Sequence, residues 1–223
     1  MLPGMNKSFG NDDARLERFV VSTYQPEDDV LRDIRERSRQ AGLPDIQLAP
    51  LDARHLEVLV RASGTRRAVE IGTLAGYSGV CILRGMPGDG RLETFELDPA
   101  HARVAAESFR RAGFGGRVNI HLGPALERLR DIETEAPFDL VFIDADKLGY
   151  PRYLDWAARH LRPGGLVVGD NAFLFGGLAE ALDGEASPEV VAMREFHERL
   201  AQGTEFRATV LPTGEGLAVG VRR

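Results

Sequence analysis

Short apolar segments of β character alternate with segments of helical pattern through the middle of this chain. The apolar segments are residues 68–71, 91–97, 118–122, 140–143 and 166–169, and helical segments are expected to start near Ser78, Pro99, Pro124, Tyr150 and Pro188. Strands that alternate with helices pair in parallel, because each helix returns the chain to the same edge of the sheet. The pattern therefore predicts a parallel sheet with helices on both faces.

The two ends of the chain depart from this alternation. Residues 205–211 and 216–221 are strand-like and are joined by Pro-Thr-Gly-Glu, which is typical of an antiparallel hairpin. At the other end, residues 27–40 and a segment beginning at Pro50 have helical periodicity, whereas residues 1–27 are expected to form an irregular arm. The predicted fold is one α/β domain over residues 1–223, with a Rossmann-like, doubly wound, mostly parallel sheet, N-terminal helices and a C-terminal hairpin.

Composition argues against several classes of function. The net charge of −6 is spread along the chain without a Lys/Arg cluster, so no nucleic-acid partner is expected. No run of about 18 apolar residues is present, so we expect no membrane span. The first residues lack the apolar core of a secretory signal, and Cys81 has no second cysteine to pair with. The cytoplasm is therefore the expected compartment.

The loop after the first predicted strand contains glycines at positions 72 and 76, directly before a helix start near Ser78. Glycine lets backbone N–H groups approach a ligand closely, and a helix N-terminus favours a carboxylate or a phosphate. The spacing differs from that of dinucleotide sites and of phosphate-binding P-loops. A tight turn between a strand and a helix would need the same glycines, so both interpretations stay open.

The second predicted strand ends at Glu96, twenty positions after Gly76. An acidic residue at this distance from a glycine loop is placed to accept hydrogen bonds from ribose hydroxyls. Its alternative role is to cap the next helix, but Asp98, directly before Pro99, suits that role better. We therefore assign the ribose to Glu96. After the third strand, the small residues around Ala125 could let a flat base lie against the backbone.

Oxygen-bearing side chains follow the fourth and fifth predicted strands. Asp144 comes directly after the fourth strand, and Asp170 and Asn171 follow the fifth. A single aspartate after a strand is more often a cap or a ribose partner. Two neighbouring carboxylates repel one another, however, and a cation removes that cost. These three oxygen donors suit Mg²⁺ or Ca²⁺.

Several segments occur in an order and at a spacing that resemble a known enzyme family. They are Glu70-Ile71-Gly72 with Gly76-Tyr77-Ser78, residues 142–147 (Phe-Ile-Asp-Ala-Asp-Lys) with Tyr150 and Tyr153, residues 161–165 (Leu-Arg-Pro-Gly-Gly), and Asp170-Asn171. Together they resemble the cation-dependent, class I S-adenosylmethionine O-methyltransferases, which include the catechol and caffeoyl-CoA O-methyltransferases. The resemblance extends from about Ile46 to the C-terminus.

The resemblance implies two cofactors, S-adenosylmethionine and a divalent cation, with Mg²⁺ preferred over Mn²⁺ or Ca²⁺. It assigns the cation to Asp144, Asp170 and Asn171. It also implies a set of residues around S-adenosylmethionine: Leu48, Glu70, Gly72, Thr73, Gly76, Ser78, Glu96, Leu97, Ala125 and Asp144.

The same resemblance implies a small phenolic acceptor with vicinal hydroxyls, and a homodimer. A cation on two vicinal oxygens orients the acceptor and lowers its pKa. Lys147, three residues after Asp144, is then the candidate general base, and a surface-exposed lysine is the alternative interpretation. The stretch 172–188 departs from the family's pattern, and Gly123-Pro124-Ala125 replaces Gly-Asp-Ala. The identity of the acceptor is therefore left open.

Two other functions are compatible with parts of the pattern. A nicotinamide-dependent oxidoreductase would share the fold and Glu96, but it would gain nothing from Asp144, Asp170 and Asn171. A non-catalytic cofactor-binding scaffold would not need these donors together with a candidate base at Lys147. Methyl transfer is the function that uses all of them.

Overall fold

The computed structural model describes residues 13–180 and 186–223. These residues form a seven-stranded sheet in the order β3-β2-β1-β4-β5-β7-β6. The strands are β1 (Arg67–Ile71), β2 (Arg91–Glu96), β3 (Val118–Leu122), β4 (Phe138–Ile143), β5 (Leu161–Gly169), β6 (Phe206–Leu211) and β7 (Leu217–Arg222). Strands β1 to β5 pair in parallel, and β7 pairs antiparallel with both β5 and β6. The predicted mostly parallel sheet with a C-terminal hairpin is confirmed.

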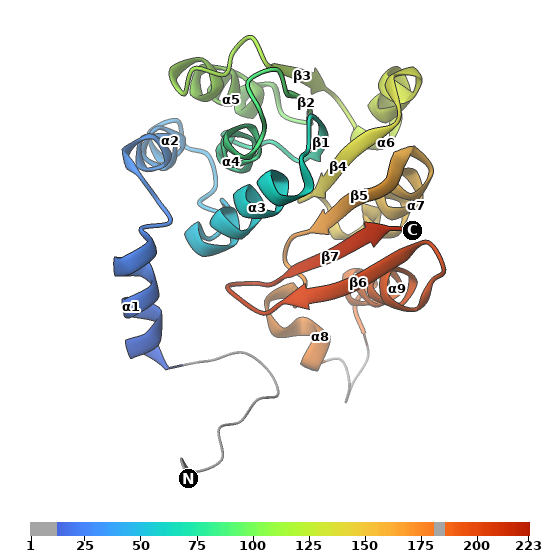
Figure 1. Cartoon of the computed structure of the whole chain (residues 1–223). Coiled ribbons are helices and arrows are strands. Elements are labelled where there is room, and N and C mark those ends of the chain that lie inside the picture. The colour runs from blue at the N-terminus through green and yellow to red at the C-terminus, as the bar shows by residue number, and fades with distance from the viewer. Residues whose placement is uncertain (1–12, 181–185) are drawn as a thin grey trace.

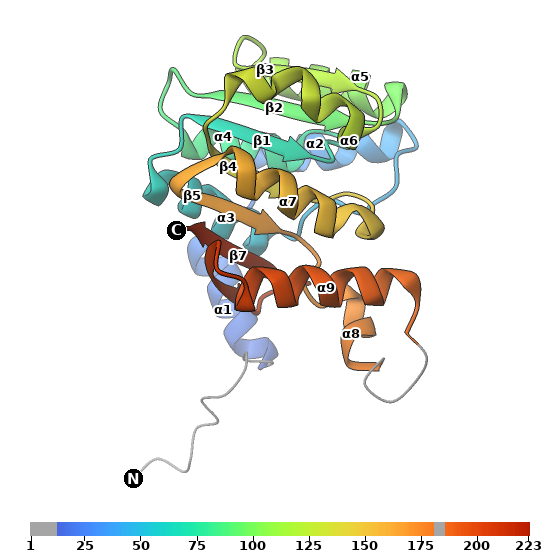
Figure 2. The same ribbon diagram turned by 90° about the vertical axis from the view of Figure 1, so that its right-hand side faces the viewer.

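Helices cover both faces of the sheet, as the two views in Figures 1 and 2 show. One face packs against α2 (Asp29–Gln40), α3 (Pro50–Ser63), α4 (Tyr77–Gly85) and α5 (Pro99–Arg111), and the other packs against α7 (Tyr150–His160) and α9 (Pro188–Gln202). Successive side chains of a strand point to opposite faces. In β4, Phe142 joins the first of these two cores, whereas Val141 and Ile143 join the second. Strands covered on both sides are mostly apolar, which is why residues 140–143 of β4 and 166–168 of β5 read as continuous apolar runs.

Polar caps and prolines define where the main helices begin. The side chain of Asp28 accepts a hydrogen bond from the Leu31 N–H at 3.1 Å, and that of Asp98 accepts one from the Ala100 N–H at 2.6 Å. Helices α3, α5, α7 and α9 have proline in their first turn. Proline loses nothing there because the first N–H groups of a helix have no intrahelical partner. The capping role predicted for Asp98 is confirmed.

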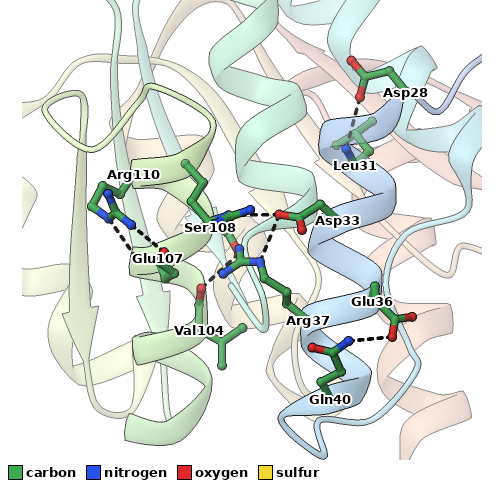
Figure 3. Close-up of polar contacts among 11 residues, drawn as sticks. Asp28, Leu31, Asp33, Glu36, Arg37, Gln40, Val104, Glu107, Ser108 and Arg110 are labelled. Atoms are coloured by element: carbon green, nitrogen blue, oxygen red, sulfur yellow. Dashed lines mark hydrogen bonds and ion pairs between the residues drawn. The ribbon is translucent and has the colours of Figure 1, made fainter.

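Helix α2 is held against α5 by a small polar cluster, drawn in Figure 3. Arg37 on α2 donates from Nη2 to the Ser108 hydroxyl on α5 at 3.0 Å. The Oδ2 atom of Asp33 accepts from Arg37 and from Arg111 of α5, each at 3.1 Å. These contacts fix α2 on the body of the fold.

Three parts of the structure differ from the sequence prediction. The arm expected to be irregular contains helix α1 (Ala14–Tyr24), so the prediction was wrong there, and residues 1–12 lie outside the described residues. None of the residues of α1 is buried within the described chain, although Leu16, Phe19 and Val20 have helical spacing in the sequence. The helix expected near Pro124 is only α6 (Ala125–Arg128), followed by the 3-10 helix η1 (Leu129–Glu135). Strand β5 begins at Leu161, five residues before the predicted segment.

The remaining elements are short and lie around the ends of the strands. They are the 3-10 helices η2 (Lys147–Gly149) and η3 (Leu174–Gly176), and the four-residue helix α8 (Gly177–Glu180). Among the described residues, no helix is both long enough and apolar enough to cross a membrane.

Candidate active site

A cavity of about 940 Å³ opens at the carboxyl ends of the parallel strands. Strand β1 lies between β2 and β4 at the centre of the sheet. The chain first builds one half of the sheet with β2 and β3, and then crosses to the other side of β1 to build the second half with β4 and β5. Ligands of open α/β sheets bind at such a switch point. Residues that follow each of the strands β1 to β5 line the cavity, and the segment before α3 contributes a further wall.

The loop after β1 is shaped by two glycines. Gly72 has a φ of +98°, and an added Cβ would collide with the carbonyl oxygen of Asp144, so the loops after β1 and β4 approach closely. Gly76 has a φ of +84°, and an added Cβ would lie 3.2 Å from the ring of Phe109. Positive φ is unstrained only for glycine. Both glycines thus have a conformational role, and Gly76 lies outside the lining of the cavity.

Glu96 connects the loop after β1 with the end of β2. Its Oε2 accepts from the backbone N–H of Leu74 at 2.8 Å and of Thr73 at 3.3 Å. Its Oε1 accepts from the Asp98 N–H at 2.9 Å and lies 3.4 Å from Nδ1 of His101. The carboxylate lines the cavity, so it supports the glycine loop and faces the space in which a ribose is expected.

Glu70 is placed behind this loop instead of in the cavity. It is fully buried, and its two oxygens accept from the hydroxyls of Ser78 and Thr94, each at 2.6 Å. Burial raises the pKa of Glu70 to about 8, against the effect of both hydroxyls. Glu70 therefore orients Ser78, which does line the cavity, at the start of α4. Sequence reasoning did not distinguish these two roles.

The other residues predicted around the cofactor mostly face the cavity. Its lining includes Leu48, Gly72, Thr73, Leu97, Ala125 and Asp144. Leu48 is buried, and its carbonyl accepts from Arg35 at 2.6 Å, which fixes the segment that crosses the cavity before α3. Leu97 is 68% exposed and therefore lies at the rim.

Asp144, Asp170 and Asn171 line one end of the same cavity. Asp170 is 4% exposed, and its Oδ1 is buried without a hydrogen-bond partner among the described residues. Burial, together with the negative charge of Asp144, raises the pKa of Asp170 to about 8. Asn171 has a φ of +52°, a conformation that asparagine tolerates better than most residues. Two carboxylates, one of which has the unpartnered buried oxygen, and one amide form a donor set that fits a hard divalent cation.

The described residues contain no group of three or more His, Cys, Asp and Glu side chains arranged to hold a metal ion. The donor set at this end has two carboxylates, and its third member is an amide. A cation here would therefore need water or acceptor oxygens to complete its shell, as Mg²⁺ sites commonly do.

Lys147 starts η2, three residues after Asp144. Its Nζ donates to the Tyr150 hydroxyl at 2.7 Å and lies 3.6 Å from Oδ1 of Asp144. Tyr150 is fully buried, with its hydroxyl near the carbonyls of Ile143 and Asp170 at 3.1 and 3.0 Å. The Lys147 side chain is only 14% exposed, so it is not the surface-exposed lysine of the alternative interpretation.

The O-methyltransferase family model matches residues 20–223. The chain belongs to the O-methyltransferase family. This methyltransferase is 38% identical to a catechol O-methyltransferase of Niastella koreensis over 198 residues, which cover 88% of this chain and 89% of the relative. It is also 38% identical to a catechol O-methyltransferase of Mycobacterium tuberculosis over 199 residues, which cover 89% of this chain and 88% of that protein.

Solved structures of similar enzymes agree with this assignment. An O-methyltransferase from Bacillus cereus in complex with SAH superposes with a TM-score of 0.86 at 34% identity, covering 94% of this chain and 97% of that one. An O-methyltransferase from Streptomyces achromogenes involved in tomaymycin synthesis, in complex with SAM, gives a TM-score of 0.85 at 33% identity, covering 93% and 96%. The protein is therefore an S-adenosylmethionine-dependent O-methyltransferase. The predicted family, fold and enzyme class are confirmed, and neither alternative is favoured.

Sequence reasoning missed several residues that line the cavity of the methyltransferase. They include Arg35 on α2, Asp52 on α3, His101 on α5, Phe175 in η3 and Glu215 in the hairpin loop. Most of them belong to no motif, and tertiary packing alone brings them to the cavity. Asp52 had a readable signal, because it stands four residues before Leu56 and so shares the buried face of its helix.

Proposed function

We propose that this methyltransferase uses a divalent cation to methylate a hydroxyl of a small catechol-type acceptor. The observation that carries the proposal is that Asp144, Asp170 and Asn171 line the same cavity as the glycine loop and Glu96, with Oδ1 of Asp170 lacking a partner among the described residues. Both curated relatives described above are named catechol O-methyltransferases, which supports this class of acceptor.

The cofactor end of the cavity is assigned to the loops after β1, β2 and β3. Glu96 would accept hydrogen bonds from the ribose, and Ser78 at the start of α4 would face the polar methionine end, where a helix N-terminus favours a carboxylate. Ala125 leaves room for a flat base. Thr73, Leu97 and Leu48 complete the wall, and Glu70 and Gly76 support it from behind.

The cation end is assigned to Asp144, Asp170 and Asn171, with Mg²⁺ as the preferred ion. When bound, the cation supplies charge that orients two vicinal hydroxyls and lowers the pKa of the one that reacts. The protein holds these donors at the ends of β4 and β5, next to the space assigned to the cofactor. Alignment of the acceptor oxygen with the methyl group is the main catalytic contribution of such a site.

Lys147 is assigned as the residue that takes the proton of the reacting hydroxyl. Its Nζ is held by the Tyr150 hydroxyl and by Asp144, so the amine stays at the cation end of the cavity. An amine in this place can accept a proton in its neutral form and return it to solvent after methyl transfer.

A homodimer is part of the same proposal. Helix α1 extends away from the body of the fold (Figure 1), and Leu16, Phe19 and Tyr24 on it are 48%, 60% and 67% exposed. Apolar side chains of this size on one short helix need a surface that covers them. A second copy of the chain would provide that surface in a closed pair.

The experiment that tests the catalytic proposal measures turnover of catechol with Mg²⁺ or with excess EDTA, and cofactor binding by calorimetry under both conditions. We expect the chelator to abolish turnover and to leave the affinity for S-adenosylmethionine largely unchanged. Asp170→Asn should lose turnover and Mn²⁺ binding, the latter measured by electron paramagnetic resonance. The matched control is Asp89→Asn. Asp89 is an exposed aspartate just before β2, at the end of the sheet where the parallel strands begin. Full turnover in EDTA would refute the cation requirement.

A further inference from the structure

We propose that the acceptor site selects its substrates by charge, accepting cationic and neutral catechols and disfavouring catechols that carry an anionic group. This inference rests on the proposed function, because it concerns the acceptor end of the same cavity. It is carried by three of the carboxylates that line the cavity outside the proposed donor set for the cation. They are Asp52, Asp146 and Glu215.

Each of these carboxylates is held in place by uncharged groups. The Oδ1 of Asp52 accepts from the Thr213 hydroxyl at 2.5 Å, and the Oδ1 of Asp146 accepts from the Tyr153 hydroxyl at 2.7 Å. The Oε2 of Glu215 accepts from the Phe175 N–H at 3.1 Å.

None of the three forms an ion pair with a lysine or arginine in the described ranges, but Oδ1 of Asp52 lies 3.9 Å from Nδ1 of His55, which is charged only when protonated. With His55 neutral, the negative charge of the three is offset only in part, by the amine of Lys147 near Asp146.

The three side chains surround the end of the cavity assigned to the cation and the acceptor. Asp146 follows Asp144 by two residues, and Asp52 is close enough to Asp170 to act on it electrostatically. Glu215 belongs to the hairpin loop that bonds the chain after Asn171, where its carbonyl accepts from the Phe173 N–H at 3.1 Å. We therefore expect an acceptor in this end of the cavity to lie near these groups.

Positive charge at this end is scarce. Lys147 is the nearby amine, and it already lies 3.6 Å from Asp144. The guanidinium of Arg35, which also lines the cavity, is paired with Glu27 at 2.6 Å, and His101 lies against Glu96. A divalent cation would balance Asp144 and Asp170, and a protonated Lys147 would balance only one of the other three carboxylates. The acceptor end keeps an excess of negative charge even when the cation is bound.

An excess of one sign in a partly enclosed cleft changes the local concentration and the association rate of charged ligands by about 10- to 1,000-fold. A thioester of coenzyme A, with its phosphates, or an acceptor with a free carboxylate should be disfavoured on this ground. An acceptor with an ammonium group should be favoured, most clearly at low ionic strength, where charges are least screened.

The test uses catechols that share a two-carbon side chain ending in an ammonium, a hydroxyl or a carboxylate. With Mg²⁺ present, we expect kcat/KM to fall in that order, by about tenfold or more from the first to the last, and the difference to shrink as salt is added. Calorimetry on the Mg²⁺ and S-adenosylhomocysteine complex should give the same order of affinities without turnover. If the carboxylate acceptor is used as well as the ammonium one, the charge inference is wrong. If none of the three is methylated, the proposed function itself fails.

Two nearly isosteric variants locate the effect. Glu215→Gln and Asp146→Asn keep a hydrogen-bond acceptor for Phe175 and Tyr153, and each should reduce the ratio of kcat/KM between the ammonium and carboxylate acceptors by about threefold or more. If these side chains had only a structural role, the substitutions would change kcat/KM for all three acceptors by the same factor, and this ratio would stay the same. Glu205→Gln removes the same charge at the other end of the hairpin, before β6, and should not change the ratio. An unchanged ratio in both site variants would overturn the proposal.

Discussion

The amine of Lys147 lies 2.7 Å from the hydroxyl of Tyr150, and Tyr150 is buried beneath the ends of β4 and β5. The tyrosine hydroxyl also lies 3.0 Å from the carbonyl of Asp170, so the amine and the proposed cation donors share one rigid support. A side chain held in this way cannot move freely into solvent.

We therefore expect Lys147→Ala to lower turnover by about 10²- to 10⁴-fold, the range of a lost acid–base group, with little change in cofactor affinity. Lys147→Arg should fail almost as badly, because a guanidinium with a pKa above about 12 does not give up its proton at working pH. Steady-state kinetics and calorimetry on both variants measure this. Near-normal turnover of the arginine variant from about pH 6 to 9 would show that Lys147 acts through its charge alone.

A second prediction concerns Glu96, which faces the cavity and also holds the backbone of Thr73 and Leu74. Glu96→Ala should weaken S-adenosylmethionine binding by about 10- to 100-fold, as expected for hydrogen bonds to a charged group. Glu96→Gln should lose less, because its amide oxygen can still accept from the loop. Titration calorimetry compares the affinities, and unchanged binding in the alanine variant would contradict the ribose assignment.

A third prediction concerns the oligomeric state. The proposed dimer should give about twice the chain mass of 24.4 kDa in light scattering at micromolar concentration. Phe19→Glu on α1 should favour the monomer, because a charge would have to be buried in the interface. Arg18→Glu, a polar exchange at the neighbouring position, serves as the control. A monomer mass for the unmodified protein across micromolar concentrations would exclude the dimer.

A fourth prediction concerns Asp139, near the start of β4. Its side chain bonds β4 to the neighbouring strands β1 and β5 at the end of the sheet away from the cavity. Its Oδ2 accepts from the N–H groups of Arg66 and Arg67 at 2.8 and 2.9 Å, and its Oδ1 accepts from Nε of Arg162 at 2.5 Å. Burial raises the pKa of Asp139, but the hydrogen bonds outweigh it, so the pKa lies below its ordinary value.

A pKa lowered by folding contributes stability above the unfolded-state value of about 3.9, and this contribution is lost as the pH falls through the folded-state pKa. Asp139→Asn should therefore lower the free energy of unfolding at pH 7 by about 1–3 kcal/mol. The difference in the free energy of unfolding between this variant and the unmodified protein should become smaller as the solution is acidified below about pH 4. Urea unfolding at several pH values measures it, and a difference that stays constant down to about pH 2.5 would contradict the assignment.

Local sequence patterns determined the fold and the main candidates at the site. Short, mostly apolar runs alternating with helical segments predicted strands with helices on both faces, and glycines or aspartates directly after them marked the ends where ligands bind. Asp144, Asp170 and Asn171 could be grouped from sequence alone, because the carboxyl ends of parallel strands meet at one edge of the sheet.

Tertiary structure decided what depends on segments distant in sequence. Glu70 looked like a cofactor residue, yet Ser78 and Thr94 enclose it behind the loop. Asp52 and Glu215 reach the acceptor end only because the hairpin loop folds back onto α3, where Thr213 bonds Asp52 across 161 positions of sequence. Helix α1 carries apolar side chains at helical spacing, and only the structure shows that none of them is buried in the described chain. The physical reason is common to all three: strand and turn patterns are local, whereas the neighbours that give a buried carboxylate or an exposed apolar side chain its role come from elsewhere in the chain.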